Sequence, residues 1–266
     1  MYLPLGFDKS IALEAADLVN QAYQQFENFQ AGTPWSLQGN YELLGEFHAR
    51  PEGLFPREEP FGFVARNKTS AAVFVTFRGT QTPEDWLSDF TLPQVAHPWG
   101  QTEKGFTHLY DQCSADVQAL VRGAGAAPVV FVTGHSLGAG LAVLAAADLV
   151  RSQVAPKAAM YSFAGPRAGN PAFAGNFNKN VAIAWRIVNT EDIVTTLPIP
   201  TPTLDNKPHA VSKFGTALSL LPSLDYEHVG IAVSFTTHKG SIADNHLMPV
   251  YIEALNASES AQAAVV

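Results

Sequence analysis

The fold is decided by the stretch PVVFVTGHSLGAGLAVLAAADLV, residues 128–150. Its β-branched start predicts a buried strand, the pentapeptide GHSLG at 134–138 predicts a sharp turn, and the small residues that follow predict a helix. In this setting G-x-S-x-G forms a nucleophile elbow, a strained turn that exposes the hydroxyl of Ser136 at the carboxyl end of a strand. The adjacent helix N-terminus favours a developing negative charge there. An ordinary turn is the alternative, and the flanking strand and helix patterns argue against it.

The composition limits the classes of partner. The chain has 266 residues, of which 47% are hydrophobic and 15% charged, enough to build one large α/β domain with a substantial core. The net charge of −8 argues against nucleic acid and against an anionic membrane as electrostatic partners. No apolar run approaches the roughly 18 residues of a membrane-spanning helix, so we expect no transmembrane segment. A monomer is the default expectation.

The single cysteine and the N-terminus bear on the compartment. Cys113 cannot form an internal disulfide, and it falls in an amphipathic helical stretch where it is a poor candidate nucleophile. No signal peptide is visible at the start of the sequence. Two expectations therefore stay open, a cytoplasmic protein or a secreted one whose leader has been removed.

Strand and helix patterns alternate along the chain, which predicts one α/β domain over residues 1–266 with a mostly parallel sheet flanked by helices. The predicted strands are 61–66, 72–77, 129–132, 158–164, 184–190 and 226–235. The predicted helices are 8–29, 105–121, 137–152 and 172–178, with a last helix after residue 246. We expect irregular structure over residues 31–60, with a short extended stretch near 41–48, and a loop at 97–99.

Three residues could form a catalytic triad. A serine hydroxyl is a weak nucleophile and needs a base within hydrogen-bond reach, which an acid orients in turn. Asp192 comes directly after the strand at 184–190, and His246 lies on the loop after the last strand. Ser136, Asp192 and His246 thus occur in the chain order of the α/β-hydrolase fold, each beyond a predicted strand. We predict that fold, with these residues as nucleophile, acid and base.

Other residues are alternatives for the acid and the base. His238 is the nearest rival for the base, and His209 lies in a proline-broken stretch that suits the role less well. The alternatives for the acid are Glu191 and Asp244. His228 is expected to be a hydrogen-bonded structural histidine.

The end of the strand at 72–77 could stabilise an oxyanion. The strand runs into Arg78-Gly79-Thr80, where a backbone N–H and the Thr80 hydroxyl could face the site above the sheet. The alternative is a simple turn without a role in chemistry.

Two segments could cover the site. Residues 81–90 have the pattern of a short helix, with Trp86, Leu87 and Phe90 on one side. This helix is either a mobile lid with an apolar underside or a rigid surface helix, and the sequence favours neither. Residues 201–224 form an insertion whose apolar second half either covers the substrate groove or packs on the body of the protein.

An ordered set of motifs resembles the class 3 lipases, the family of the fungal triacylglycerol lipases. The resemblance spans roughly residues 61–255 and is carried by VTFRGT (75–80), Trp86 with Asp89, GF (105–106), VTGHSLGAGLA (132–142), SFAGPRAGNPAF (162–173), VNTEDIV (188–194), YEHVG (226–230) and NHLMPVYI (245–252). It implies that Thr80 and the backbone N–H of Leu137 form the oxyanion hole, and that residues 81–90 are the lid. Secreted fungal members usually carry disulfides, and residues 201–224 have no counterpart, so neither location nor acyl-chain preference is implied.

The expected function is hydrolysis of a carboxylic ester through an acyl-enzyme, without cofactor or metal. The resemblance favours triacylglycerols and related lipid esters at an oil–water interface. A carboxylesterase, a phospholipase A1 or a feruloyl esterase without lid activation is the alternative within enzymes. A binding module that keeps the fold without catalysis is the alternative outside them.

Overall fold

The computed structural model describes residues 1, 6–51, 57–80, 93–125, 129–198 and 225–258. The candidate lid at 81–90, with Trp86, Leu87 and Phe90, lies outside the described residues. The insertion at 201–224, which contains His209, lies outside them as well.

The centre of the molecule is a sheet of seven strands in the order β1-β2-β3-β6-β7-β8-β9. The first three strands pair antiparallel, and every pair from β3 to β9 is parallel. The strands are β1 (Tyr41–Ala49), β2 (Glu59–Asn67), β3 (Val73–Phe77), β6 (Val130–His135), β7 (Ala159–Phe163), β8 (Ala184–Asn189) and β9 (Ile231–Phe235). The prediction of a mostly parallel sheet is confirmed.

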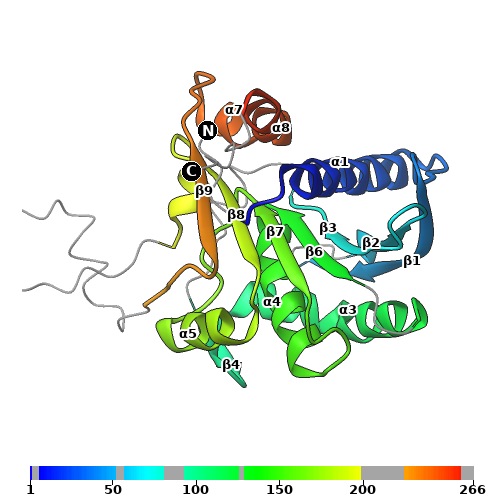
Figure 1. Ribbon diagram of the computed structural model, residues 1–266, viewed down its shortest axis with the longest axis horizontal. Coiled ribbons are helices and arrows are strands. Elements are labelled where there is room, and N and C mark those ends of the chain that lie inside the picture. Colours follow the sequence, from blue (N-terminus) through cyan, green and yellow to red (C-terminus); the bar gives the residue numbers. More distant parts are fainter. Residues whose placement is uncertain (2–5, 52–56, 81–92, 126–128, 199–224, 259–266) are drawn as a thin grey trace, which may run out of the picture.

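Helices cover both faces of this sheet (Figure 1). One face carries α1 (Lys9–Ala31), α7 (Ile242–His246) and α8 (Met248–Ala257), and the other carries α3 (Lys104–Gly123), α4 (Leu137–Arg151) and α5 (Pro171–Asn180). Successive strand residues point to opposite faces. Phe74 accordingly belongs to the core on the α1 side and Val75 to the core on the α4 side. Burial on both faces explains why the central strands are apolar at nearly every position.

The starts of two helices are stabilised by capping residues. Asp8 Oδ1 accepts a hydrogen bond from Ser10 N at 2.8 Å at the start of α1. Asn170 Oδ1 accepts from Phe173 N at 2.9 Å at the start of α5, where Pro171 occupies the first helical position.

The short extended stretch expected near 41–48, within the otherwise irregular region 31–60, is confirmed as strand β1. As an edge strand, β1 has an irregular burial pattern, and its register with β2 shifts between Leu43 and Gly45. The loop predicted at 97–99 is the turn of a two-stranded hairpin formed by β4 (Gln94–His97) and β5 (Gly100–Glu103), so the prediction is wrong only at His97. The two hairpin strands lack the regular alternation from which a strand can be predicted.

Two boundaries near the C-terminus differ from expectation. The last strand begins at Ile231 instead of Tyr226, because Gly230 turns the chain at φ 70°. His246 ends the short helix α7 instead of lying on a loop. The sequence carried a signal for this helix, since Ser241 Oγ accepts from Asp244 N at 3.0 Å as its N-cap.

Candidate active site

Ser136 stands at the junction of β6 and α4 with φ 59° and ψ −127°, a conformation that a non-glycine residue rarely adopts. Its backbone N–H donates to Phe163 O of the neighbouring strand at 3.1 Å. A Cβ on Gly134 would lie 2.1 Å from Gly138 O, and a Cβ on Gly138 would lie 2.4 Å from Arg78 O. The turn therefore requires both glycines, and it has the strained geometry of a nucleophile elbow.

Asp192 and His246 form a buried pair beside the sheet. Asp192 directly precedes the 3₁₀ helix η1 (Ile193–Thr196), and its Oδ2 accepts from His246 Nδ1 at 2.7 Å. The exposed fractions are 0% for Asp192 and 1% for His246. Tyr251 OH donates to the same Oδ2 at 2.5 Å, and Val194 N donates to Oδ1 at 3.0 Å. Three donors thus satisfy a carboxylate that has no contact with water.

Two asparagines join the loops that carry this pair. Asn189 Nδ2 donates to Asn245 O at 3.1 Å and to Thr237 O at 2.9 Å. Asn245 Nδ2 donates in the opposite direction to Glu191 O at 3.1 Å. The loop after β8 and the helix α7 are therefore held together by reciprocal side-chain to backbone bonds, which fix the acid relative to the base.

His135, which precedes the serine, ties the base to the elbow. Its Nε2 donates to the carbonyl oxygen of His246 at 2.7 Å, and its Nδ1 accepts from Tyr23 OH at 2.8 Å. The two imidazole rings lie 4.6 Å apart between centroids. Burial, together with the neighbouring His246, lowers the pKa of His135 well below its ordinary value. His135 is thus a neutral structural histidine.

The acid and base are in contact, while the hydrogen bond between serine and base is not formed in this structure. Among the residues that the structure describes, neither Ser136 Oγ nor His246 Nε2 has a hydrogen-bond partner, although both atoms are buried. Because His246 Nδ1 donates to Asp192, Nε2 is left as a proton acceptor. Buried polar atoms without partners are rare, and they concentrate where a substrate will bind. Catalytic hydrogen bonds are often long before the substrate binds.

The loop after β3 lies against the elbow. A Cβ on Gly79 would lie 2.9 Å from the Cβ of Ser136 and 2.4 Å from Tyr23 OH. The buried Arg78 holds the loop, since its guanidinium donates to Gly79 O at 2.8 Å and forms an ion pair with Glu59 at 2.5 Å.

Thr80 and Leu137 are the predicted oxyanion donors, and each is next in sequence to a residue of the elbow contact, Gly79 or Ser136. Thr80 directly follows Gly79, and its Oγ1 is buried without a hydrogen-bond partner in the described ranges. Leu137 is the first residue of α4, where backbone N–H groups have no intrahelical acceptor. Both residues therefore keep a donor for another group.

The alternative acids Glu191 and Asp244 and the alternative base His238 lie at the surface, whereas His209 is outside the described residues. Glu191 pairs with His238 at 3.4 Å, with side chains 43% and 67% exposed. Asp244 is exposed and accepts from Ser241 Oγ at 2.7 Å. His228 Nε2 donates to a backbone carbonyl, as expected of a structural histidine. Burial raises the pKa of the Cys113 thiol to about 12, so this thiol is no nucleophile at neutral pH.

The family model for "Lipase (class 3)" matches residues 74–201, a range that contains the elbow and Asp192. The chain belongs to the class 3 lipase family. The resemblance found in the sequence is confirmed.

This class 3 lipase family member is similar to two curated proteins, one from Arabidopsis thaliana and one from Rhizomucor miehei. The chain is 30% identical over 223 residues to the chloroplastic phospholipase A(1) DAD1 of Arabidopsis thaliana, covering 72% of this chain and 48% of the relative. It is 33% identical over 145 residues to a lipase of Rhizomucor miehei, covering 51% of this chain and 40% of the relative. The chain thus spans about half the length of these relatives or less.

A solved structure supports the same fold. The Rhizomucor miehei lipase propeptide complex aligns with a TM-score of 0.63 at 22% identity, over 86% of this chain and 69% of that one. The α/β-hydrolase fold is confirmed. None of the helices within the described ranges combines the length and apolar character needed to cross a bilayer.

Some residues around the site were not identified from the sequence. No role is predicted from the sequence for Tyr23, His135, Asn189, Asn245 or Tyr251. A usable signal existed for the tyrosines, because a buried phenol needs a hydrogen-bond partner. The asparagines gave no such signal, since their partners are backbone atoms of distant loops.

Proposed function

We propose that this chain is a serine hydrolase that cleaves acyl esters of glycerolipids through an acyl-enzyme. The observation that carries the proposal is the buried Asp192–His246 pair, 2.7 Å apart and tethered through His135 to a serine on a strained elbow. The unpartnered Ser136 Oγ and His246 Nε2 support it, because they are the atoms between which a proton would move.

In the proposed mechanism, Ser136 Oγ attacks the acyl carbonyl while His246 Nε2 takes its proton. Asp192 holds His246 in the tautomer with a protonated Nδ1 and stabilises the imidazolium that forms. The oxyanion receives hydrogen bonds from the N–H of Leu137 and from the N–H and hydroxyl of Thr80. The alcohol leaves with the proton from His246, and water then hydrolyses the acyl-enzyme with the same base.

Removal of the nucleophile tests the reaction. Ser136→Ala should lower kcat on a p-nitrophenyl ester by about six orders of magnitude, judged from other serine hydrolases. A fluorophosphonate should label the wild-type protein and not the variant. Near wild-type turnover by Ser136→Ala would exclude the mechanism, and a wild-type protein without labelling or turnover would favour a binding module.

Two lipid classes are candidate substrates. Triacylglycerols are the first candidate, supported by the similarity to the Rhizomucor miehei lipase. Phospholipids cleaved at the sn-1 ester are the second, supported by the similarity to the Arabidopsis phospholipase A(1). Initial rates on both, with matched acyl chains, would separate them. Hydrolysis of short soluble esters or feruloyl esters alone would indicate a plain carboxylesterase or a feruloyl esterase.

The assignment of residues 81–90 as a lid remains a proposal from the sequence. It rests on the apolar side formed by Trp86, Leu87 and Phe90. A jump in rate when a sparingly soluble ester passes its solubility limit would support the lid, and a smooth curve would favour a fixed helix.

A further inference from the structure

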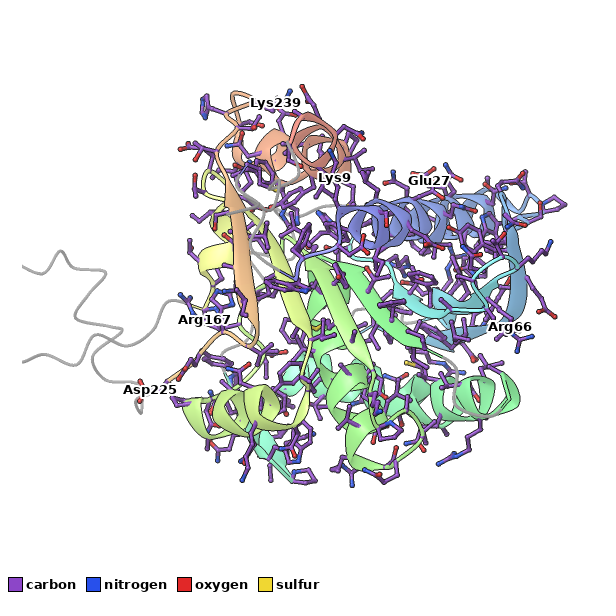
Figure 2. The ribbon with its side chains drawn as sticks, viewed as in Figure 1. Lys9, Glu27, Arg66, Arg167, Asp225 and Lys239 are labelled. Carbon is purple, nitrogen blue, oxygen red and sulfur yellow. The ribbon has the colours of Figure 1, made fainter. Side chains whose placement is uncertain are left out.

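A cavity of about 550 Å³ opens at the β9 edge of the sheet, on the side of α5. Arg167, from the loop after β7, and Arg186, from the middle of β8, both line it. Figure 2 shows Arg167 at this edge, across the molecule from Arg66. The cavity therefore gathers two guanidinium groups outside the candidate catalytic residues.

Both arginines are tied to backbone carbonyls and not to acids. Arg186 Nε donates to Val229 O at 2.9 Å. Arg167 Nη1 donates to Thr196 O and to Pro198 O, the latter at 2.7 Å. Within the described part of the chain, no carboxylate oxygen lies within 4.0 Å of either guanidinium. Nη2 of Arg167 and both terminal nitrogens of Arg186 make no hydrogen bond to the described residues.

Other partly or fully buried arginines of this protein do have acidic partners. These pairs are Arg66 with Glu42 at 3.0 Å and Arg78 with Glu59 at 2.5 Å. Burial, with the like charge of Arg167 nearby, lowers the pKa of Arg186 to about 10, so Arg186 stays charged at neutral pH. A partly buried cation beside another cation is unfavourable unless an anion compensates it.

The remaining walls suit an anion. Pro171 is the first residue of α5, so the positive end of that helix faces the cavity. Burial and the two arginines lower the pKa of His228 to about 3, which leaves it neutral and adds no charge. Asp225 and Glu227 also line the cavity, and both are exposed, so solvent screens their charges.

We propose that this cavity binds a phosphate group, held by Arg167 and Arg186. A guanidinium can donate two parallel N–H hydrogen bonds to the oxygens of a phosphate. A hydrogen bond from the same guanidinium to a backbone carbonyl leaves other N–H donors available for this pairing. The carbonyl of Thr196 that Arg167 contacts belongs to η1, the helix that begins after Asp192. The phosphate is either free or part of a phospholipid headgroup, and the second case rests on the proposed function.

Thermal unfolding with inorganic phosphate tests the site itself. The melting temperature of the wild type should rise saturably with phosphate, compared with chloride at equal ionic strength. Arg186→Met keeps the apolar stem and removes a charge that has no acidic partner among the described residues. This variant should fold yet lose at least four-fifths of the shift. The matched control Arg66→Met, at the opposite edge, should keep the whole shift. Absence of a saturable shift in the wild type, or an equal shift in Arg186→Met, would overturn the proposal.

Hydrolysis then identifies the source of the phosphate. For a headgroup, the ratio of kcat/KM on phosphatidylcholine to that on diacylglycerol with the same acyl chains should fall about tenfold in Arg186→Met and stay constant in Arg66→Met. A phosphate-dependent melting shift with an unchanged ratio would assign the site to free phosphate. If the wild type hydrolyses no ester, the proposed function fails while the melting experiment still decides the site.

Discussion

At the scale of single residues, the candidate acid depends on donors that are not themselves catalytic. Asp192 accepts from His246, Tyr251 and Val194, and all three donors come from elements packed around β8. A hydrogen bond to a charged group contributes about 1.5–3 kcal/mol, so the loss of one donor should affect both stability and catalysis. Tyr251 is thus a positioning residue for Asp192.

Tyr251→Phe removes only the hydroxyl that bonds Asp192. We expect the free energy of unfolding to fall by about 1.5–3 kcal/mol and kcat to fall about tenfold, measured by urea titration and ester turnover. The control is Tyr110→Phe, because Tyr110 OH donates to Asp148 at 3.0 Å away from the site. A similar loss of stability in both variants, without a difference in kcat, would reduce Tyr251 to a structural role.

At the scale of elements, the junction of β6 and α4 determines where the serine lies. The strand and the helix meet so closely that the backbone of residue 138 occupies the space of a side chain at residue 134. Helix α4 is buried from Leu137 to Val150. Because it is rich in small residues, its backbone can lie close to the sheet. The close packing and the strained φ of Ser136 therefore depend on each other.

Gly134→Ala should destabilise the protein by about 3 kcal/mol or more, because its Cβ would lie 2.1 Å from Gly138 O. Gly175→Ala, within α5 and with nothing within 4 Å of its Cβ, should instead stabilise by roughly 0.5–1 kcal/mol. Urea unfolding of both variants measures whether the free energy of unfolding falls or rises relative to the wild type. Equal stability of Gly134→Ala and the wild type would show that the turn tolerates a Cβ.

At the scale of the whole molecule, buried neutral histidines should make stability depend on pH. The pKa of His228 is lowered to about 3 by burial and two arginines, and burial, with the neighbouring His246, lowers that of His135 well below its ordinary value of 6.5. Below pH 6.5 the unfolded chain therefore binds more protons than the folded protein. The free energy of unfolding should fall with falling pH, by up to about 1.4 kcal/mol per unit for each histidine.

His228→Gln tests this dependence, since an amide can still donate to Thr195 O. In phosphate-free buffer between pH 6 and 5, the slope of unfolding free energy against pH should be shallower than in the wild type by up to about 1.4 kcal/mol per unit. His238→Gln, at an exposed position, should leave the slope unchanged. An unchanged slope in His228→Gln would show that this histidine is not held neutral.

The sequence by itself determined the elbow, the order of strand and helix around it, and the helix caps at Asp8 and Asn170. These features depend on residues a few positions apart, whose backbone preferences are local. The short strands β4 and β5 escaped prediction because their pairing with each other, and not a regular sequence pattern, makes them strands.

Only the tertiary structure decided which side chains meet. The bond between Tyr23 and His135 joins residues 112 positions apart, and the bond between Asp192 and His246 joins residues 54 apart. The order of residues along the chain could suggest the Asp192–His246 pair through the topology of the fold. It could not suggest that this pair is buried or that Tyr251 and Val194 also donate to Asp192. The lack of an acidic partner for Arg167 and Arg186 among the described residues is likewise invisible in the sequence, because it is a property of three-dimensional neighbours.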